Sequence, residues 1–186
     1  YMLRIIWRIF HTDSDLSIEA IKDYLNEFLP DDIAVKSIED ASEKFHAGYN
    51  IKSVTYVYKI NNNELRDVFN RKYVYSCEVK LNLEEMRSTA EFLVGTHDFQ
   101  YFAASPENIK STIKTINYIN ITKEDNMIEI EINADEFLWN MIRIIIGSLL
   151  EVGKGNIDAT DIEKLLNETT ASAYIPMARA KGLCIR

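Results

Sequence analysis

The sequence predicts an α+β protein with an antiparallel sheet and helices packed on one face of it. Stretches of alternating apolar and polar residues, typical of strands, are joined mostly by short loops that suit hairpins. Other stretches repeat apolar residues at helical spacing and are interposed between these strands. With 186 residues, 47% of them hydrophobic and 27% charged, the chain has the composition of a globular domain that buries its own core.

The first helix is predicted over Ile18–Phe28, where apolar residues recur at helical spacing. Asp15 or Ser17 can cap its start, and Leu29-Pro30 ends it, because proline cannot continue a helix. The apolar segment Ile33–Val35 is then interpreted as a short strand.

A pair of strands is predicted next. Val54–Ile60 alternates in polarity, and Tyr73–Val79 does so again after a loop of three asparagines. Asn82, with Glu85 three residues later, forms a capping-box pattern that opens a helix through Leu93. Gly95 ends this helix by supplying the left-handed backbone that a helix C-terminus favours.

The second half of the chain begins with a predicted hairpin, Ile113–Ile121 and Met127–Asn133. In its second strand the isoleucines are expected to face the core and the glutamates water. Glu136–Val152 is predicted as the most buried helix, stopped by Gly153. A short amphipathic helix over Asp158–Asn167 and a final strand over Leu183–Ile185 complete the fold.

Several classes of function are excluded by missing motifs. His11, His46 and His97 are scattered, and no pair has the spacing of zinc ligands on a helix. The sequence has no glycine-rich nucleotide loop and no serine in a nucleophile elbow. His97 and Asp98 are interpreted as structural, because adjacent strand residues point to opposite faces. Cys77 and Cys184 are far apart in sequence and form no CxxC pair, which favours a reduced, cytoplasmic protein. The longest apolar run, around Ile144–Gly147, is interrupted by Arg143 and Glu151, so no membrane-spanning segment is predicted.

Charge is unevenly distributed along this acidic chain, whose net charge is −8. Residues 44–80 carry only three acidic residues, and this window is also rich in tyrosine. This pattern fits a local surface that binds RNA or another anion. It also fits an ordinary solvent-exposed surface on which acidic residues from elsewhere in the chain balance the basic ones. The basic residues of the window are Lys44, Lys52, Lys59, Arg66, Arg71, Lys72 and Lys80.

Arg143 and Tyr56 are the two residues that ask for a functional explanation. Arg143 lies within a helix that is apolar on nearly every face, and a buried guanidinium needs a carboxylate or phosphate partner. The alternative is a buried aliphatic stem with its charged end in water. Tyr56 lies on an alternating strand in the basic window, where its ring can stack on an exposed base or pack in the core.

Six segments, taken together, resemble the tRNA pseudouridine synthase A family in order and spacing. The resemblance implies an α+β catalytic domain of two related halves and a homodimer whose basic cleft grips tRNA. It also implies isomerisation of uridines in the anticodon stem-loop to pseudouridine, with no cofactor and no metal. The segments are Leu29–Val35, Phe45–Ala47, Ser53–Tyr58, Phe92–Phe99, Phe137–Gly153 and Gly182-Leu183.

Two site residues follow from this resemblance. Tyr56 matches the family's active-site tyrosine, which packs on the target base, and Arg143 matches the arginine that pairs with the catalytic aspartate. Lys44, His46 and Lys52 are predicted as weaker RNA contacts. Within the family fold, residues 1–43 are expected to belong to the N-terminal half and residues 44–186 to form the C-terminal half.

The chain also departs from the family pattern. Gly48 stands where the family usually has arginine, and Lys114 replaces a frequent arginine. The family's nucleophilic aspartate stands in a Gly-Arg-Thr-Asp-x-Gly-Val loop, which by the resemblance falls just before Tyr1. We therefore expect a C-terminal portion with negligible turnover by itself. The alternatives are a non-catalytic remnant that binds tRNA and an interaction domain that pairs through an open sheet edge.

Overall fold

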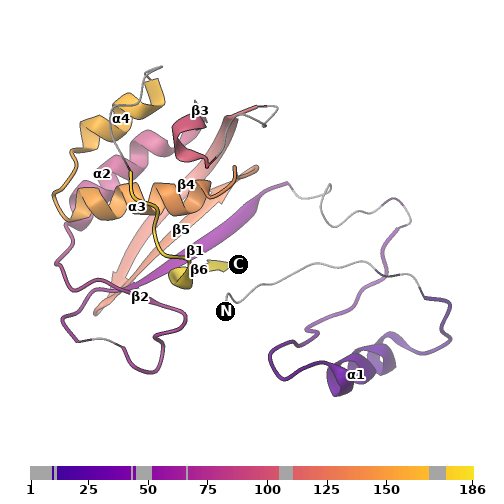
Figure 1. The fold of residues 1–186 in the computed structure, drawn as a ribbon. Coiled ribbons are helices and arrows are strands. Elements are labelled where there is room, and N and C mark those ends of the chain that lie inside the picture. The colour runs from indigo at the N-terminus through magenta and orange to yellow at the C-terminus, as the bar shows by residue number, and fades with distance from the viewer. Residues whose placement is uncertain are drawn as a thin grey trace. The chain divides into compact units, whose positions relative to one another are not determined.

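The computed structural model describes residues 10, 12–42, 44, 52–65, 67–104, 111–167 and 175–186. The described residues fall into two compact units, the smaller within residues 6–51 and the larger from Lys52 to Arg186 (Figure 1). Each unit is taken by itself below.

The smaller unit is built around helix α1, Ile18–Phe28, as predicted. The Ser17 hydroxyl caps it by accepting a hydrogen bond from the Ala20 N–H at 3.2 Å. The predicted strand Ile33–Val35 is wrong, because this segment has no strand pairing. The side-chain amide of Asn26 instead bonds both the N–H and the carbonyl of Val35, at 2.7 and 3.1 Å.

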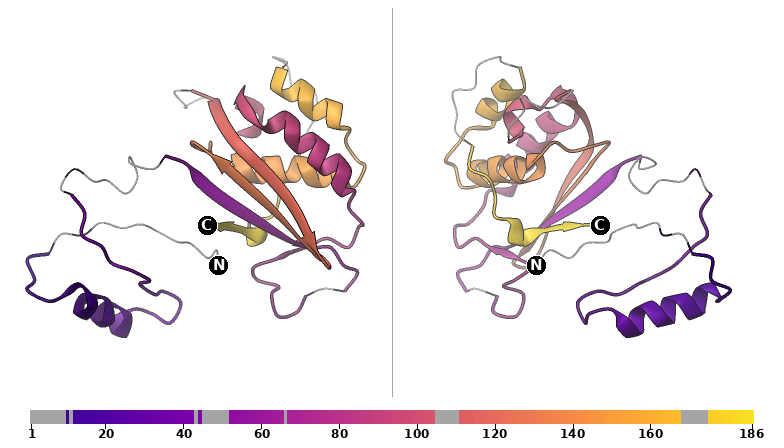
Figure 2. Two further views of the ribbon diagram at one scale, coloured as in Figure 1. Left: turned by 180° about the vertical axis from the view of Figure 1, so that it is seen from behind. Right: turned by 45° about the vertical axis from the view of Figure 1, so that its right-hand side comes forward.

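The larger unit holds a six-stranded sheet in the order β2-β1-β5-β4-β3, with β6 paired to β1. Three helices cover one face of this sheet, as Figures 1 and 2 show from several sides. The predicted α+β class with helices on one face is confirmed, although one strand pair makes the sheet mixed. The strands are β1 Val54–Asn61, β2 Tyr75–Ser76, β3 Gly95–Asp98, β4 Ile113–Glu124, β5 Met127–Ala134 and β6 Leu183–Ile185; the helices are α2 Leu83–Leu93, α3 Met141–Gly153 and α4 Ala159–Asn167.

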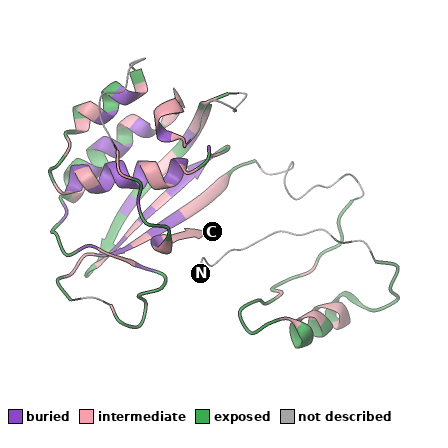
Figure 3. Ribbon diagram, viewed as in Figure 1, coloured by how far each residue is buried: buried purple, intermediate pink, exposed green. Residues whose placement is uncertain are grey.

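The core lies between the sheet and its helices (Figure 3). On β5 the isoleucines at 128, 130 and 132 are buried, and the intervening glutamates face away, as predicted. Glu129 pairs with Lys59 of β1 at 2.9 Å across the open face. The β4–β5 hairpin is also confirmed, and Asp125 takes a positive φ of 51° in its turn.

Strand β2 is shorter than predicted and runs parallel to β1, pairing over only two residues of each strand. The prediction of a strand over Tyr73–Val79 is therefore wrong in length. Beyond Ser76, the side-chain amide of Asn62 donates to the carbonyls of Cys77 and Val79, at 2.9 and 2.7 Å. A side chain thus takes the place of a neighbouring strand.

Helix α2 begins and ends as predicted. The Asn82 side chain accepts from the N–H groups of Glu84 and Glu85 at 3.2 and 3.4 Å. The backbone N–H of Asn82 donates to the carbonyl of Gly153 at 2.8 Å, which ties α2 to the end of α3. Gly95 has a φ of +113°, a conformation that side chains disfavour, directly after the cap residue Val94.

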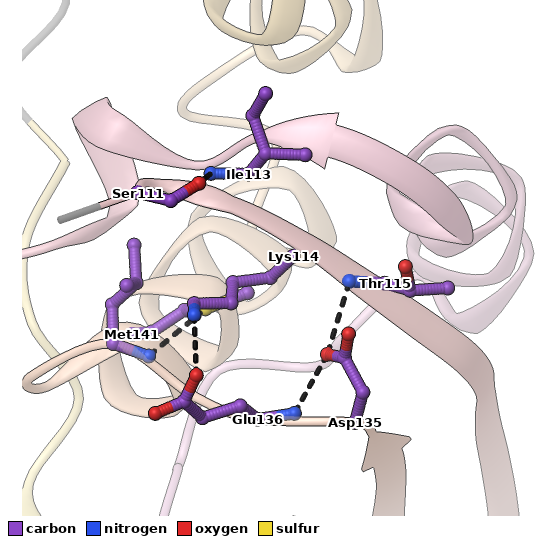
Figure 4. Close-up of polar contacts among 8 residues, drawn as sticks. Ser111, Ile113, Lys114, Thr115, Asp135, Glu136 and Met141 are labelled. Carbon is purple, nitrogen blue, oxygen red and sulfur yellow. Dashed lines mark hydrogen bonds and ion pairs between the residues drawn. The ribbon is translucent and has the colours of Figure 1, made fainter.

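Helix α3 begins at Met141, five residues later than the predicted start at Glu136. The Asp135 carboxylate accepts from the N–H groups of both Thr115 and Glu136, at 3.1 and 2.6 Å (Figure 4). These bonds keep the chain non-helical after β5. Asn140 then takes a left-handed φ of 60°, which a helix interior does not allow.

Candidate active site

Tyr56 lies on β1, on the side of the strand that faces the helices. It stands opposite Ile132 of β5 and Ile185 of β6. The side chain is half-buried, and its ring meets that of Phe137 edge to face, with centroids 5.5 Å apart and planes at 89°. Such a pair fixes the orientation of both rings. Tyr56 is thus neither a fully buried core tyrosine nor a free surface ring.

Arg143 lies near the start of α3, and its side chain is also half-buried. Its Nε donates to the carbonyl of Ala178 at 2.8 Å, while the Ala178 N–H donates back to the Arg143 carbonyl at 2.9 Å. Nη1 lies 3.4 Å from Oδ1 of Asn140. Among the described residues, no carboxylate forms an ion pair with Arg143. Neutral oxygens therefore orient this guanidinium.

Tyr58 joins the strand to the same C-terminal segment. Its hydroxyl donates to the Arg179 carbonyl at 2.8 Å. Burial raises the pKa of this phenol far above its usual range, and the charge of Tyr75 adds to the effect. The positive charges of Arg143 and Arg179 act in the opposite direction, so both guanidinium groups lie within electrostatic range of Tyr58.

Two glycines allow the C-terminal segment to lie this close. A Cβ on Gly147 of α3 would stand 1.8 Å from the Pro176 carbonyl oxygen, which is far inside contact distance. A Cβ on Gly182 would stand 2.8 Å from the Lys59 carbonyl oxygen and 2.9 Å from the Tyr58 ring. The segment from Pro176 to Gly182 thus fits between α3 and β1 because these two positions have no side chain.

The site therefore joins β1, the start of α3 and the C-terminal segment. The sequence predicted Tyr56 and Arg143 as site residues but did not indicate Asn140 and Ala178, which contact Arg143. The Ala178 contact comes from backbone atoms far along the chain, and no local pattern signals it. For Asn140, the sequence shows only that it directly precedes an apolar helix, which does not indicate a contact with Arg143.

The weaker RNA contacts predicted from the sequence are Lys44, His46 and Lys52, and none of the contacts described for Tyr56 and Arg143 involves them. Lys52 is exposed just before β1, and Lys44 is exposed in the smaller unit. His46 lies outside the described residues. His97 and Asp98 lie in β3, where His97 Nε2 bonds the Val94 carbonyl at 3.0 Å and Asp98 accepts from the Gln100 N–H at 3.0 Å. Both of these contacts are local.

Comparison with known proteins decides the family. Residues 89–185 match the family model described as tRNA pseudouridine synthase. The chain is 54% identical to tRNA pseudouridine synthase A 1 of Clostridium tetani, over 95% of this chain and 72% of that protein. The chain belongs to the tRNA pseudouridine synthase A family. It is also 38% identical to tRNA pseudouridine synthase A 2 of Bacillus cereus, over 94% of this chain and 71% of that protein.

Family membership confirms the resemblance inferred from the sequence segments. The region that matches the family model contains strands β5 and β6 and helix α3, which holds Arg143. Within the described part of the chain, no three acidic, histidine or cysteine side chains gather closely enough to hold a metal ion. No helix in that part combines the length and the apolar character needed to cross a membrane.

Proposed function

We propose that this chain supplies the arginine and the base-binding surface of a tRNA pseudouridine synthase. The observation that carries the proposal is Arg143. Backbone and amide oxygens hold its guanidinium beside the strand of Tyr56, and no carboxylate of the described residues neutralises it. A half-buried cation in this state favours an incoming carboxylate and lowers its pKa.

Conversion of uridine to pseudouridine needs a carboxylate, and a neighbouring cation such as Arg143 keeps a carboxylate ionised. Isomerisation breaks the C1′–N1 bond of uridine, forms a C1′–C5 bond, and moves a proton from C5 so that N1 ends protonated. A carboxylate acting on the sugar, as nucleophile or as base, opens this route. Arg143 keeps that carboxylate ionised and oriented. By family resemblance the carboxylate is the aspartate expected before Tyr1.

Tyr56 and Phe137 supply the second requirement, which is a surface for the extruded base. A uridine reacts only after it leaves its stack, and aromatic rings compensate for the lost stacking. The edge-to-face contact with Phe137 holds the Tyr56 ring in one orientation. The strand therefore offers an oriented ring for the base, and Arg143 acts electrostatically on Tyr58, two residues along the same strand.

The test uses a chimera as well as the chain itself. The part of the Clostridium tetani relative that this chain does not match is fused ahead of Tyr1. Tritium release from C5-labelled uridine in a tRNA transcript is then measured, since C5 loses its hydrogen in the reaction. We expect turnover by the chimera and none by the chain alone. A chimera that folds and binds tRNA but releases no tritium would contradict the enzymatic proposal.

Variants of the chimera test the residue roles. Arg143→Ala should abolish turnover, whereas Arg87→Ala should not, because Arg87 pairs with Glu84 on the exposed side of α2. Turnover like that of the parent in Arg143→Ala would refute the pairing. Tyr56→Phe keeps a stacking ring and should retain more activity than Tyr56→Ala.

The finer parts of the proposal concern substrate, assembly and chain organisation. We expect modification within the anticodon stem-loop, and an isolated stem-loop transcript should compete with whole tRNA. We expect a homodimer, which the mass measured by light scattering tests. Residues 1–43 would belong to the N-terminal half of the fold and residues 44–186 to the C-terminal half. A chain that binds tRNA while its chimera stays inactive would instead be a non-catalytic remnant.

A further inference from the structure

A surface recess lies where the loop after β1 meets the segment before β6. Its volume is about 450 Å³. We name it the phosphate recess, and the residues that line it are Asp67, Val68, Arg71, Lys72, Ser76 and Lys181. Three of these six side chains are cationic and one is anionic.

The three cations are not neutralised by the rest of the described protein. Within the described residues, neither Arg71, Lys72 nor Lys181 forms an ion pair with a carboxylate. Other lysines of the same unit do, including Lys154 with Glu151 at 2.6 Å and Lys114 with Glu136 at 2.5 Å (Figure 4). An acidic protein thus leaves three positive charges together around one recess.

Asp67 offsets one of the three positive charges, so the charged side chains of the recess still have a net positive charge, and its carboxylate also folds its own loop. Its oxygens accept from the N–H groups of Phe69 and Asn70 at 3.0 and 2.9 Å, and from the Asn70 side chain at 2.7 Å. These hydrogen bonds, those from Asn70 above all, lower the pKa of Asp67. The Asp67 carboxylate fixes the loop that presents Arg71 and Lys72.

The recess is linked to the candidate active site through the C-terminal segment. Lys181 comes two residues after Arg179, whose carbonyl accepts from Tyr58. Arg143 and Arg179 both act electrostatically on Tyr58. The C-terminal segment therefore has Arg179 within electrostatic range of Tyr58 and Lys181, two residues later, at the recess. Cations at both places suit a ligand with more than one negative charge.

The β1–β2 loop also carries an exposed aromatic ring. Phe69 is 95% exposed and lies next to the loop cations in sequence. Surfaces that bind single-stranded nucleic acid combine cations for the backbone with rings on which bases stack. The apolar ring and the cations together favour RNA over a small anion.

We infer that the phosphate recess binds a backbone phosphate of the tRNA strand that flanks the modified uridine. This inference rests on the proposed function, because it gives the substrate of that site a second point of attachment. In this inference Arg71, Lys72 and Lys181 contact the phosphate oxygens. Contacts to phosphate position a strand without reading its sequence.

The test is binding of an unmodified tRNA transcript to the chain, measured by fluorescence anisotropy over a range of salt concentrations. The variant combines Arg71→Glu, Lys72→Glu and Lys181→Glu. Lys164→Glu on the exposed side of α4 is the control for a reversal of charge elsewhere, and circular dichroism checks that each protein is folded. We expect the triple variant to weaken binding at least tenfold, and the control to stay within about twofold. The slope of log K against log salt should become shallower by about one for each phosphate that the variant no longer binds.

The outcomes separate this inference from the proposed function. Equal affinity of the triple variant and the control would overturn the phosphate recess and leave the enzymatic proposal standing. A parent chain that does not bind tRNA would overturn the phosphate recess, whereas the enzymatic proposal is decided by tritium release from the chimera. In a third arm inorganic phosphate is titrated without RNA. Inorganic phosphate could bind to the parent but not to the triple variant while both proteins bind tRNA with equal affinity. The recess would then bind free phosphate, and the inference that it binds the tRNA backbone would be wrong.

Discussion

Gly147→Ala probes the contact on which the candidate site depends. The new Cβ would stand 1.8 Å from the Pro176 carbonyl oxygen, which is backbone and cannot rotate away. The segment from Pro176 onward must therefore move off α3. Overpacking of this kind costs about 1–3 kcal/mol. The displacement also endangers the pair of bonds between Arg143 and Ala178 and the bond from Tyr58 to Arg179, each worth about 1 kcal/mol.

Where all three hydrogen bonds are lost, the expected decrease in the free energy of unfolding is therefore about 4–6 kcal/mol. Urea unfolding of the chain followed by circular dichroism measures it. Gly155→Ala is the matched control: a Cβ there meets nothing within 4 Å, but its φ of +75° makes alanine strained by about 1–2 kcal/mol. If Gly147→Ala unfolds at the same urea concentration as the parent, the segment does not lie against α3 as described. A loss no larger than that of Gly155→Ala would refute the argument from close packing.

Three further predictions test other contacts. Tyr58→Phe removes the donor to the Arg179 carbonyl and should lower the free energy of unfolding by about 1 kcal/mol at neutral pH. Because burial raises the pKa of Tyr58, folding favours its neutral form, so the parent should lose stability as pH rises above about 10. Tyr58→Phe should lose less over that range, and equal loss in both proteins would contradict this assignment. Asn82→Ala removes the cap of α2 and should cost about 1 kcal/mol in urea unfolding, while Asn120→Ala on an exposed position of β4 should cost less than about 0.5 kcal/mol. Asn140→Gly keeps the left-handed backbone but removes the amide beside Arg143, so the chimera should stay folded and release tritium more slowly; a rate equal to the parent's would show that Asn140 does not position the arginine.

The local spacing of apolar residues was sufficient to predict the position of elements that pack one face on a core. Helices α1 and α2, the β4–β5 hairpin and strand β6 lie where the sequence predicts them. Their caps are also local: Ser17 and Asn82 bond N–H groups within three residues of themselves. A pattern of spacing contains the information that such contacts need.

The errors occur where a distant side chain takes over the backbone hydrogen bonds of a segment. Asn26 bonds Val35, Asn62 bonds Cys77 and Val79, and Asp135 bonds Thr115 and Glu136. Each of these contacts ends or prevents a regular element that the local pattern predicts. The partner cannot be identified from spacing, because the fold brings it close.

The sequence by itself determined the fold class and the family, and it predicted Tyr56 and Arg143 as site residues, because periodicity and ordered segments are properties of the chain alone. Only the tertiary structure decided how Arg143 is held. Its Nε and carbonyl bond the backbone of Ala178, and that contact exists because Gly147 lets the C-terminal segment lie against α3. The phosphate recess likewise joins cations from two distant segments. Every residue has a backbone carbonyl, so the sequence does not indicate which carbonyl a side chain will contact. Contacts of this kind are known only once the packing of distant segments is known.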